Sequence, residues 1–379
     1  MTTMVENKDK KVLNAPHLRF PEFSGEWEKH TIGELCEEFK SGKNIKAENI
    51  QAGGVYPVFG GNGLRGYADR YNHEGDYVLI GRQGALCGNV RFVTGKTYIT
   101  EHAIAAKATN NNYTHFLEYL FVRLNLGQFS DQSAQPGLAV NKLLKIETFA
   151  PSKEEQYKIA SLLKFLDERI ATQNKVIEDL KKLKSAIAER VYNCRTYQLY
   201  RIGDVIEQVS KRNNSMSIDK VLSVSNKLGF INQSEQFEDR IVASEDTSNY
   251  KIVYKDDFAY NPARINVGSI ARLKHFNKGI VSPMYICFRV KQGIVLDYLE
   301  YFFTTNYFFY EMQKRLEGSV RQCLSFEGLC NIPIYIPNLD EQQKIGRKVS
   351  VIMEKIDNEN RYLDSLKMQK QYLLRQMFI

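Results

Sequence analysis

A glycine-rich stretch in the first third of the chain has the spacing of a cofactor-binding loop. FGGNG at residues 59–63 fits the F-x-G-x-G pattern of an S-adenosylmethionine loop, and GNGLRG at 61–66 reads as G-x-G-x-x-G. Such a loop needs a strand before it and a helix after it, because the helix N-terminus faces the ligand. YADRYNHEGD follows instead, which indicates a turn and another strand. The glycines therefore predict a turn between strands.

Other catalytic patterns are weaker still. NPAR at 261–264 resembles the N-P-P-[FY] motif of adenine methyltransferases, but it lacks the second proline and the aromatic residue that stacks on a flipped base. The six histidines show no metal-ligand spacing. We find no nucleophile elbow, phosphate loop or carboxylate–lysine nuclease pair. The sequence therefore predicts a binding or scaffold component that is not an enzyme and binds no cofactor and no metal itself.

Composition limits the class of protein. A chain of 379 residues is expected to form two or more domains. The formal charge of +8, from 52 basic and 44 acidic residues, permits a polyanionic partner without demonstrating one. The six cysteines form no C-x-x-C pair, which favours reduced thiols. The polar start MTTMVENKDKK is unlike a secretory signal, and no apolar run reaches the roughly 18 residues of a membrane span. We expect a cytoplasmic protein.

One helix-start sequence occurs twice in the chain. PSKEEQYKIASLL at 151–163 returns as PNLDEQQKIGRKV at 337–349, and 337 − 151 gives an offset of 186 residues. Ser152 and Asn338 are N-cap residue types, and Glu155 and Glu341 follow three residues later. This spacing predicts a capping box in each copy, with the glutamate reaching back to the cap backbone.

Behind each cap, apolar residues recur at alternating spacings of four and three, which is typical of a coiled coil. Polar residues interrupt both patterns at matching places, Gln173 with Glu359 and Lys184 with Lys370. We expect each helix, about 50 Å long at roughly 1.5 Å per residue, to pair with the other; two independent helices on separate domains are the alternative. The predicted seam is Ile159, Leu163, Leu166, Ile170, Ile177, Leu180, Ile187, Val191, Ile345, Val349, Ile352, Ile356, Leu363, Leu366, Leu373 and Met377.

Two globular segments, which we call heads, lie outside the helices. Short β-type runs occur in both, YVLIG at 77–81, NVRFV at 89–93, IVYK at 252–255, SIARL at 269–273 and MYICFRV at 284–290. Each head also has one helix-like stretch, at 115–124 and 297–306. GDYVLIGR at 75–82 resembles DDFAYNPAR at 256–264, which places an arginine at the end of each. The heads have diverged more than the helices, which suggests that each head recognises something different.

The predicted fold class is α+β, with two mixed α/β domains separated by two long helices that form an antiparallel coiled coil. The whole chain is then an internal pseudo-two-fold repeat. We expect an N-terminal segment at 1–26, a first head at 27–150, a central helix at 151–196, a second head at 197–336 and a C-terminal helix at 337–379.

These residues resemble the specificity subunit of type I restriction–modification systems over nearly the whole chain. The resemblance rests on LRFPEFSGEWEKHTIGEL at 18–35, YPVFGGNGLRGY at 56–67, LIGRQGALCGNV at 79–90 and the two P-x-x-x-E-Q helix starts. It implies that the heads are target-recognition domains, each reading one half of a bipartite, asymmetric site in double-stranded DNA. It also implies that the helices set the gap between the halves and dock two methyltransferase subunits.

The same resemblance assigns the chemistry to partners. It implies methyltransferase subunits that use S-adenosylmethionine to methylate adenine N6. It further implies restriction subunits that use ATP and Mg²⁺ to translocate and cut unmethylated DNA.

Candidate DNA contacts follow from residue type and from expected loop position. Arginine and lysine suit guanine, while asparagine and glutamine suit adenine. The candidates in the first head are Lys43, Asn44, Asn62, Arg65, Arg82 and Gln83. Those in the second are Lys211, Arg212, Asn261, Arg264, Asn266, Arg321 and Gln322. Arg82 and Arg264 rank first, because we expect them at matched strand ends.

Two other functions stay open at this point. A self-contained modification or restriction enzyme would need the methyltransferase loop and the N-P-P motif that the sequence lacks. A coiled-coil scaffold whose heads bind proteins would show large exposed apolar patches on the heads, whereas DNA readers would show a basic face.

Overall fold

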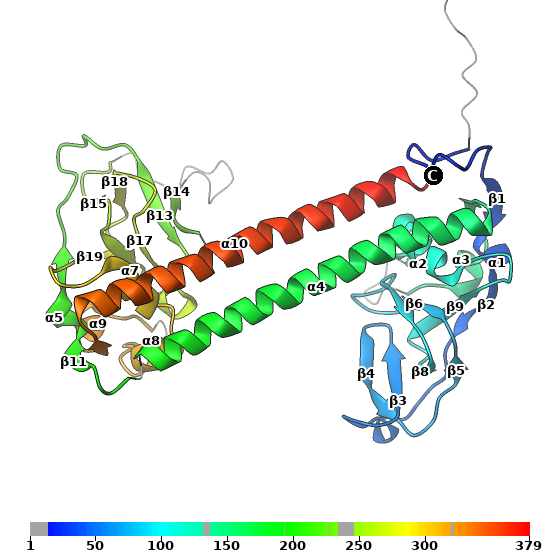
Figure 1. Cartoon of the computed structure of the whole chain (residues 1–379), viewed down its shortest axis with the longest axis horizontal. Helices are drawn as coiled ribbons and strands as arrows, with labels where there is room; N and C mark the ends of the chain where they lie inside the picture. The colour runs from blue at the N-terminus through cyan, green and yellow to red at the C-terminus, as the bar shows by residue number, and fades with distance from the viewer. Residues whose placement is uncertain (1–13, 132–136, 193, 227, 234–245, 320–321) are drawn as a thin grey trace, which may run out of the picture. The chain divides into compact units, whose positions relative to one another are not determined.

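The computed structural model describes residues 14–131, 137–192, 194–226, 228–233, 246–319 and 322–379 (Figure 1). The chain forms two compact units. Unit 1 contains the residues up to Asn174 together with Tyr362–Ile379, and unit 2 contains Lys175–Arg361. Each unit therefore combines one head with a part of each long helix. The predicted boundaries instead kept both helices apart from the heads.

Unit 1 contains two four-stranded sheets and a short two-stranded pair. The first sheet has the order β2 (Cys36–Ser41), β9 (Ala103–Ala108), β6 (Tyr77–Gly81), β7 (Val90–Val93). The second has the order β4 (Gly63–Ala68), β3 (Tyr56–Gly60), β8 (Lys96–Ile99), β5 (His73–Glu74). The pair is β1 (Glu28–Thr31) with β10 (Glu147–Ala150). The helical segments are α1 (Ile32–Leu35), η1 (Ala47–Asn49), α2 (Thr114–Leu124), η2 (Leu126–Phe129) and α3 (Val140–Leu143).

Unit 2 repeats this topology strand for strand. Its sheets are β12 (Ile206–Val209), β19 (Ile286–Val290), β16 (Phe258–Tyr260), β17 (Ile270–Arg272), and β14 (Gly229–Asn232), β13 (Val221–Ser225), β18 (Lys278–Val281), β15 (Lys251–Tyr254). β11 (Gln198–Arg201) pairs with β20 (Pro333–Ile336). The helical segments are α5 (Ile202–Val205), η3 (Ile265–Val267), α7 (Leu296–Phe302), α8 (Asn306–Gln313) and α9 (Phe326–Cys330). β3–β8 and β13–β18 are parallel in their respective units, which confirms the internal repeat.

The predicted strands and short helices occur with small shifts. β6 covers 77–81 as predicted, and β15 is shifted by one residue from its predicted run. β7, β17 and β19 are one or two residues shorter than their predicted runs. The helix predicted at 297–306 ends at Phe302. It ends early because Thr305 is the N-cap of α8, where its hydroxyl accepts a hydrogen bond from the Phe308 N–H at 3.1 Å.

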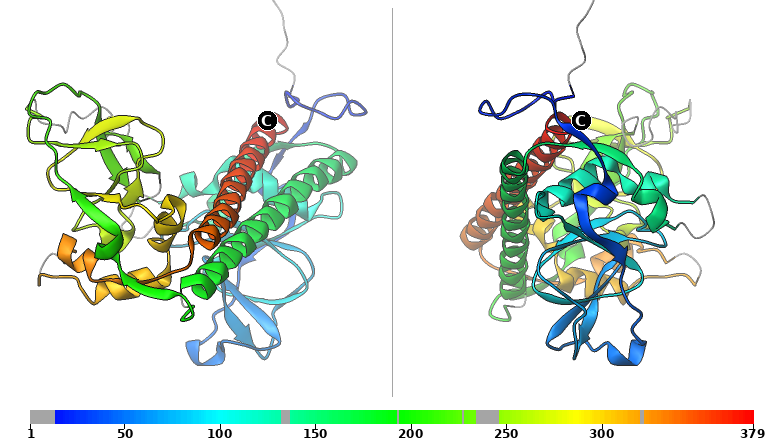
Figure 2. Two further views of the ribbon diagram at one scale, coloured as in Figure 1. Left: turned by 60° about the vertical axis from the view of Figure 1, so that its left-hand side comes forward. Right: turned by 90° about the vertical axis from the view of Figure 1, so that its right-hand side faces the viewer.

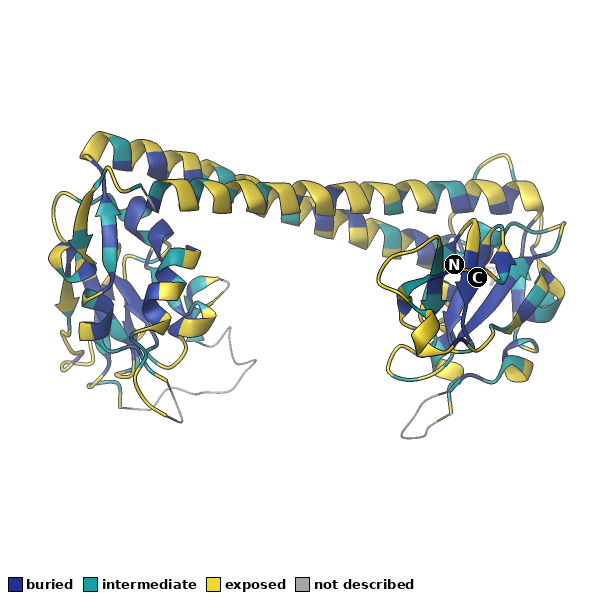
Figure 3. Ribbon diagram, turned by 90° about the horizontal axis from the view of Figure 1, so that it is seen from below, coloured by how far each residue is buried: buried dark blue, intermediate teal, exposed yellow. Residues whose placement is uncertain are grey.

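Both long helices contribute to the core of each unit. In unit 1, Trp27 and Phe116 pack with Leu163 of α4 (Lys153–Tyr192), with Leu366 of α10 (Leu339–Gln376) and with Phe378, which follows α10. In unit 2, Tyr298 and Phe302 pack with Tyr192 of α4 and Val349 of α10. Figure 3 shows the buried stripe along each helix. Neither helix is therefore a bare connector, because each supplies core side chains to both units.

The two helices run antiparallel within each unit (Figures 1 and 2). In unit 1, Asp167 binds Lys370 and Arg169 contacts Tyr362. In unit 2, Ala188 and Tyr192 near the end of α4 share one core cluster with Ile345 and Val349 near the start of α10. Residue numbers therefore rise along one helix as they fall along the other. Of the sixteen predicted seam residues, eleven are buried, five are intermediate and none is exposed. None of the helices in the described ranges is long and apolar enough to cross a bilayer.

The repeated helix start is a joint between the long helix and the head. Gln156 and Gln342 are 1% and 2% exposed. The Gln156 side-chain oxygen accepts a hydrogen bond from the Tyr113 N–H at 2.9 Å, and its amide donates to the Pro151 carbonyl at 2.9 Å. Gln342 does the same with the Val295 N–H at 2.9 Å and the Pro337 carbonyl at 3.0 Å. Tyr113 and Val295 are the N-caps of α2 and α7, so the glutamine fixes where the head begins its own helix.

The predicted capping boxes are half correct. The Ser152 hydroxyl accepts from the Glu155 N–H at 3.4 Å, and the Asn338 side chain accepts from the Glu341 N–H at 3.0 Å. The glutamate carboxylates do not reach back as predicted. Glu155 forms a bidentate pair with Arg19 at 2.7 Å, and Glu341 accepts from the Tyr197 hydroxyl at 2.7 Å. Long-range partners replace the local bond because both carboxylates face the segment that enters the head.

Candidate nucleic-acid interface

Four chain connections meet at one edge of unit 1, which we call edge 1. They are the β3–β4 turn at 61–62, the β6–β7 connection at 82–89, the β8–β9 turn at 100–102 and the loop at 131–138, of which 132–136 lie outside the described residues. A Cβ added at Gly61 would lie 2.6 Å from the His102 carbonyl oxygen and 3.3 Å from Gly81 Cα. The Arg82 N–H donates to the His102 carbonyl at 2.9 Å, and the Arg82 carbonyl accepts from the Leu138 N–H at 2.9 Å. Backbone contacts thus hold these connections together.

Most of the predicted contacts of the first head lie on edge 1. Asn62 and Gln83 are exposed, and Arg82 is partly buried. Arg65 is exposed on β4, and its aliphatic stem packs on Gly60 at the end of β3. The Gln83 side-chain oxygen lies 3.2 Å from His102 Nδ1, which joins two of the connections through their side chains.

Lys43 and Asn44, both exposed, follow β2 at the same end of the sheet. The Lys43 N–H donates to the Ile99 carbonyl at 3.0 Å, directly before the β8–β9 turn. The first-head candidates are therefore gathered at one edge and its flank.

Arg91 also lies on edge 1, and sequence reasoning missed it. It is exposed on β7, and its guanidinium packs over Gly63, where an added Cβ would lie 3.2 Å from Arg91 Nη2. Gly63 has φ +101°, a conformation that favours glycine. The absence of a side chain at this position leaves room for the Arg91 guanidinium. Candidate contacts are expected in loops, whereas Arg91 lies on a strand. Its signal was the alternation of β7, where Arg91 lies between partly buried neighbours.

Edge 1 carries unneutralised positive charge. Many basic residues of unit 1 are paired, such as Arg19 with Glu155 and Lys107 with Glu37 at 2.6 Å. Within the part of the chain that the structure describes, Arg65, Arg82 and Arg91 form no ion pair with a carboxylate. Glu101, in the β8–β9 turn, contacts His102 at 3.2 Å. Three unpaired guanidinium groups at one edge can attract phosphate and hydrogen bond to bases.

Unit 2 builds the equivalent edge, edge 2, from the equivalent connections. They are the β13–β14 turn at 226–228, the β16–β17 connection at 261–269, the β18–β19 turn at 282–285 and the loop at 317–324, with 227 and 320–321 outside the described residues. The Leu324 N–H donates to the Pro262 carbonyl at 3.1 Å, and the Ser269 hydroxyl donates to the Val224 carbonyl at 3.0 Å. Asn261 Nδ2 lies 3.9 Å from Met284 Sδ. The four connections therefore meet here as they do in unit 1.

The candidates of the second head have different surroundings. Arg264, Asn266 and Gln322 are exposed on edge 2. Asn261 is only 7% exposed, and its side-chain oxygen accepts from the Ala263 N–H at 3.1 Å, so it shapes the turn. Arg321 lies outside the described residues.

Lys211 and Arg212 lie beside edge 2. Both are exposed next to the start of β15, where Arg212 donates to the Asn249 side chain at 2.6 Å. Lys251, the first residue of that strand, donates to the Tyr285 carbonyl in the β18–β19 turn at 2.6 Å. The two residues therefore flank the four connections.

The backbone register does not pair Arg82 with Arg264. The Gly81 N–H donates to Asn89 and the Asn261 N–H donates to Ser269, so Gly81 corresponds to Asn261. Arg82 then corresponds to Pro262, and both carbonyls accept from the equivalent leucines, Leu138 and Leu324. The expectation of matched arginines is wrong, because Arg264 lies two residues beyond the strand-end position.

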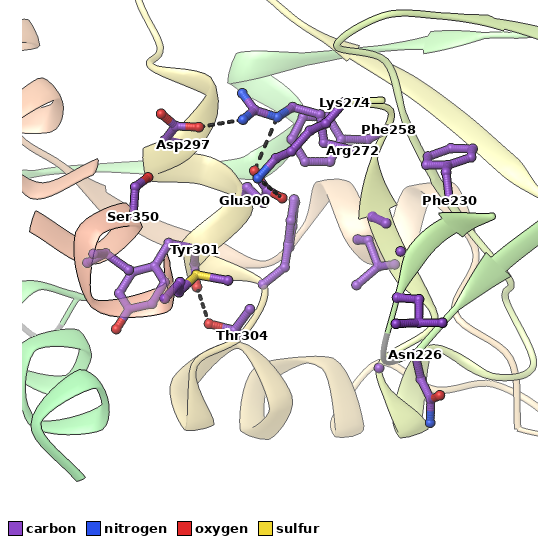
Figure 4. Close-up of a pocket in the computed structure, with 18 of the residues that line it drawn as sticks. Asn226, Phe230, Phe258, Arg272, Lys274, Asp297, Glu300, Tyr301, Thr304 and Ser350 are labelled. Atoms are coloured by element: carbon purple, nitrogen blue, oxygen red, sulfur yellow. Dashed lines mark hydrogen bonds and ion pairs between the residues drawn. The ribbon is translucent and has the colours of Figure 1, made fainter. Parts of the chain in front are cut away.

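A cavity of about 470 Å³ extends from edge 2 to α10 (Figure 4). Asn226 lies at its edge-2 end, and Arg272 of β17 pairs with Asp297 and, at 3.1 Å, with Glu300 of α7. In unit 1 the position of Arg272 is occupied by Phe92, whose ring stacks on His115 at 3.5 Å. The two heads thus fill one structural position with different chemistry. Among the described residues, no group of three histidine, cysteine, aspartate or glutamate side chains could hold a metal ion.

The fold and the two edges define a class of protein with two similar heads that present different side chains from one loop framework. The model of the type I restriction modification DNA specificity domain matches residues 24–182 and again residues 195–368. The chain belongs to this family, so it is a DNA-specificity protein of the type I restriction–modification class. A protein-binding scaffold is not favoured.

Individual relatives agree with this placement. The chain is 39% identical over 180 residues to the type I restriction enzyme EcoprrI specificity subunit of Escherichia coli, a match that covers 46% of this chain and 44% of that relative. It is 22% identical over 385 residues to a putative type I specificity subunit of Mycoplasma genitalium, covering 93% and 94%. The crystal structure of a type I S subunit from M. genitalium superposes with a TM-score of 0.70 at 18% identity, covering 96% of this chain and 99% of that one.

Proposed function

We propose that this chain is the non-catalytic specificity subunit of a type I complex and that each edge reads one half of a bipartite, asymmetric DNA site. The observation that carries the proposal is the repeated edge. Four equivalent connections meet in each unit on the same sheet topology, yet their exposed side chains differ. A repeated framework with different readers suits a site whose halves differ in sequence.

The long helices are proposed to set the gap between the halves and to dock two methyltransferase subunits. Phe165, Arg169 and Tyr362 form an exposed group in unit 1, with the Arg169 guanidinium 5.7 and 5.8 Å from the two ring centres. The residues 186 positions away, Val351, Lys355 and Val176, are exposed in unit 2. Exposed apolar and basic side chains at equivalent positions of both units suit two copies of one partner.

The chemistry is proposed to come from those partners. Methyltransferase subunits would use S-adenosylmethionine to methylate adenine N6, and restriction subunits would use ATP and Mg²⁺ to cut unmethylated DNA. The role of this chain would be to bind double-stranded DNA and select the site.

Methyl transfer with purified components tests this proposal. The methyltransferase subunit encoded with this chain is assayed on unmethylated genomic DNA, with and without the chain. We expect site-directed methylation only when both are present, and DNA binding by the chain that weakens with salt. Equal methylation without the chain, or a chain that assembles with its partner but gives no DNA binding, would contradict the proposal.

A further inference from the structure

We infer that the first head contains a proton-dependent contact between its two sheets, which we call the lock. The lock is the imidazolium of His73, on β5 of the second sheet, held between Asn72 and the Glu38 carboxylate of β2 in the first sheet. When the proton leaves, the lock opens and the backbone before the β8–β9 turn loses an anchor. This inference goes beyond the proposed function and does not depend on it.

The backbone of β8 sets the orientation of the Asn72 side chain. The side-chain oxygen accepts a hydrogen bond from the Ile99 N–H at 2.8 Å, and the side-chain amide donates to the Ile99 carbonyl at 2.9 Å. A flipped amide would place donor against donor and acceptor against acceptor, so the position of the oxygen is determined. The same oxygen lies 2.6 Å from His73 Nδ1. His73 therefore carries a proton on Nδ1 and donates it to Asn72.

The second ring nitrogen of His73 then needs a proton as well. Nε2 lies 3.1 Å from Glu38 Oε1. A neutral ring with its proton on Nδ1 directs a lone pair from Nε2, and this lone pair repels a carboxylate at such a distance. A proton between the two atoms replaces the repulsion with a charge-assisted hydrogen bond. The contact is therefore favourable only while both ring nitrogens are protonated.

The carboxylate of Glu38 is held in its ionised form. The Lys40 ammonium lies 3.1 Å from Oε1, and the Tyr77 hydroxyl donates to Oε2 at 3.0 Å. Burial raises the pKa of Glu38, but the hydrogen bonds from Lys40 and Tyr77 bring it below its ordinary value. Lys96, on the opposite strand β8, pairs with Glu74 at 3.9 Å. The proton of the lock therefore belongs to the imidazole and not to Glu38.

The charged groups around His73 decide how the lock responds to pH. Burial lowers the pKa of His73 below its ordinary value, the Glu38 carboxylate limits the fall, and the ammonium groups of Lys40 and Lys43 add to it. A His73 that stays buried but loses Glu38 has a still lower pKa, so the proton favours the closed contact. The contact is present at acidic pH and is lost as pH rises through the pKa of His73.

The lock acts on the backbone that leads into the β8–β9 turn. Ile99 is the last residue of β8, and its carbonyl also accepts from the Lys43 N–H at 3.0 Å. Asn72 holds both polar backbone groups of Ile99. When Nε2 loses its proton, repulsion from Glu38 displaces the His73 ring, and Asn72 loses the bond from Nδ1. The amide hydrogen of Ile99 then becomes easier to expose.

The second head has valine at the position of the lock. Gly81 corresponds to Asn261, and because 261 − 81 and 253 − 73 both give 180, Val253 takes the place of His73. The strands agree, since β5 pairs antiparallel with β8 as β15 pairs antiparallel with β18. Val253 is fully buried in an apolar cluster with Ala259. The second head is therefore an internal control that cannot titrate at this position.

Magnetic resonance of the full chain, labelled with nitrogen-15 histidine, tests the protonation state directly. Long-range proton–nitrogen correlation distinguishes protonated from unprotonated ring nitrogens, and His73→Val identifies the signals of this residue. We expect Nδ1 of His73 to remain protonated at every pH, while Nε2 loses its proton as pH rises. A neutral His73 ring that carries its proton on Nε2 would overturn the assignment.

Hydrogen exchange of the full chain tests the consequence for the backbone. Exchange is measured at about pH 5 and about pH 8, which bracket the charge change of histidine, and is corrected for the intrinsic effect of pH. Peptides that contain Ile99 are compared with peptides that contain Val281, the last residue of β18. We expect protection at Ile99 to fall by about ten- to one-hundredfold as pH rises and protection at Val281 to stay constant. Constant protection at Ile99 would overturn the inference.

A matched pair of variants separates the lock from general effects of pH. In Glu38→Gln the amide can donate to the neutral Nε2 of His73, so the anchor at Ile99 should persist at high pH and the pH dependence should vanish. Glu37→Gln removes the neighbouring exposed carboxylate and should keep the pH dependence of the wild type. A Glu38→Gln chain that behaves like the wild type would contradict the role of Glu38.

Discussion

At the scale of single residues, the glutamate–glutamine pair at each helix start has a larger role than its local spacing indicated. The sequence predicted the cap, and the cap is present at Ser152 and Asn338. It did not predict that Glu155 binds Arg19, because those residues are 136 positions apart. Nor did it predict the buried glutamines, each of which accepts a hydrogen bond from the N-cap N–H of a different helix. Local sequence patterns predict hydrogen bonds between neighbouring residues. The contacts of Glu155 and of the two glutamines join residues that are distant in sequence, so a local pattern does not predict them.

The glutamine joint gives a stability prediction with an internal control. Gln342→Ala leaves the part-buried Val295 N–H and the buried Pro337 carbonyl without their partner, and an unsatisfied buried group costs about 1–3 kcal/mol of unfolding free energy. Gln343→Ala removes an exposed neighbour on the same helix and should change stability little. Urea unfolding of the two variants measures the difference. Equal midpoints would show that the joint adds nothing to stability.

Buried tyrosines predict alkaline sensitivity. Burial raises the pKa of Tyr77 and of Tyr301 to about 12, and it raises the pKa of Tyr298 as well. The unfolded chain ionises these groups near pH 10. Because the folded pKa is the higher one, the stabilisation is complete below about pH 10 and is lost as pH rises toward 12. Unfolding midpoints followed with phenolate absorbance should fall across this window, and a constant midpoint would contradict the assignment.

At the scale of elements, the sequence predicted strands and helices well and their register poorly. β6 was predicted to the residue, since a continuous apolar run between turn signals is distinctive. The match of Arg82 to Arg264 failed because sequence alignment does not fix which backbone groups pair across a sheet. Arg91 was not predicted because it lies on a strand, whereas base contacts were expected in loops. The hydrogen bonds of Gly81 and Asn261 supply the register that the sequence lacks.

The long helices predict how the DNA site responds to a change in their length. One extra heptad after Gln173 and another after the equivalent Glu359 keep the apolar seam in phase. Each helix lengthens by about 10 Å, which corresponds to roughly three base pairs. We expect both half-sites to be retained and the gap between them to widen. Adding the heptad to one helix alone breaks the pairing and is the control. An unchanged gap with the double insertion would contradict the spacing role.

At the scale of the whole molecule, duplication explains the features that the two units share, and divergence explains the features in which they differ. Tyr192 and Phe378, 186 positions apart, fill equivalent places against Tyr298 and Phe116. The apolar pattern revealed this repeat directly, because cores select for volume and periodicity. The equivalence of the two edges is harder to predict from the sequence, since Arg91 and Ala271 occupy one structural position with unrelated side chains. Surface positions that contact DNA are free to diverge between the two heads. The sequence therefore predicts the location of the DNA-contacting loops better than the bases that they recognise.

Mapping of methylated adenines across a genome tests the two-reader description of this chain. The map is recorded in a host with the chain and its partner subunits, and again after deletion of the chain alone. We predict one asymmetric motif, two short halves separated by a fixed gap, that is methylated in the first host and lost in the second. A map in which no motif disappears, or in which the lost motif is a single uninterrupted sequence, would contradict the account.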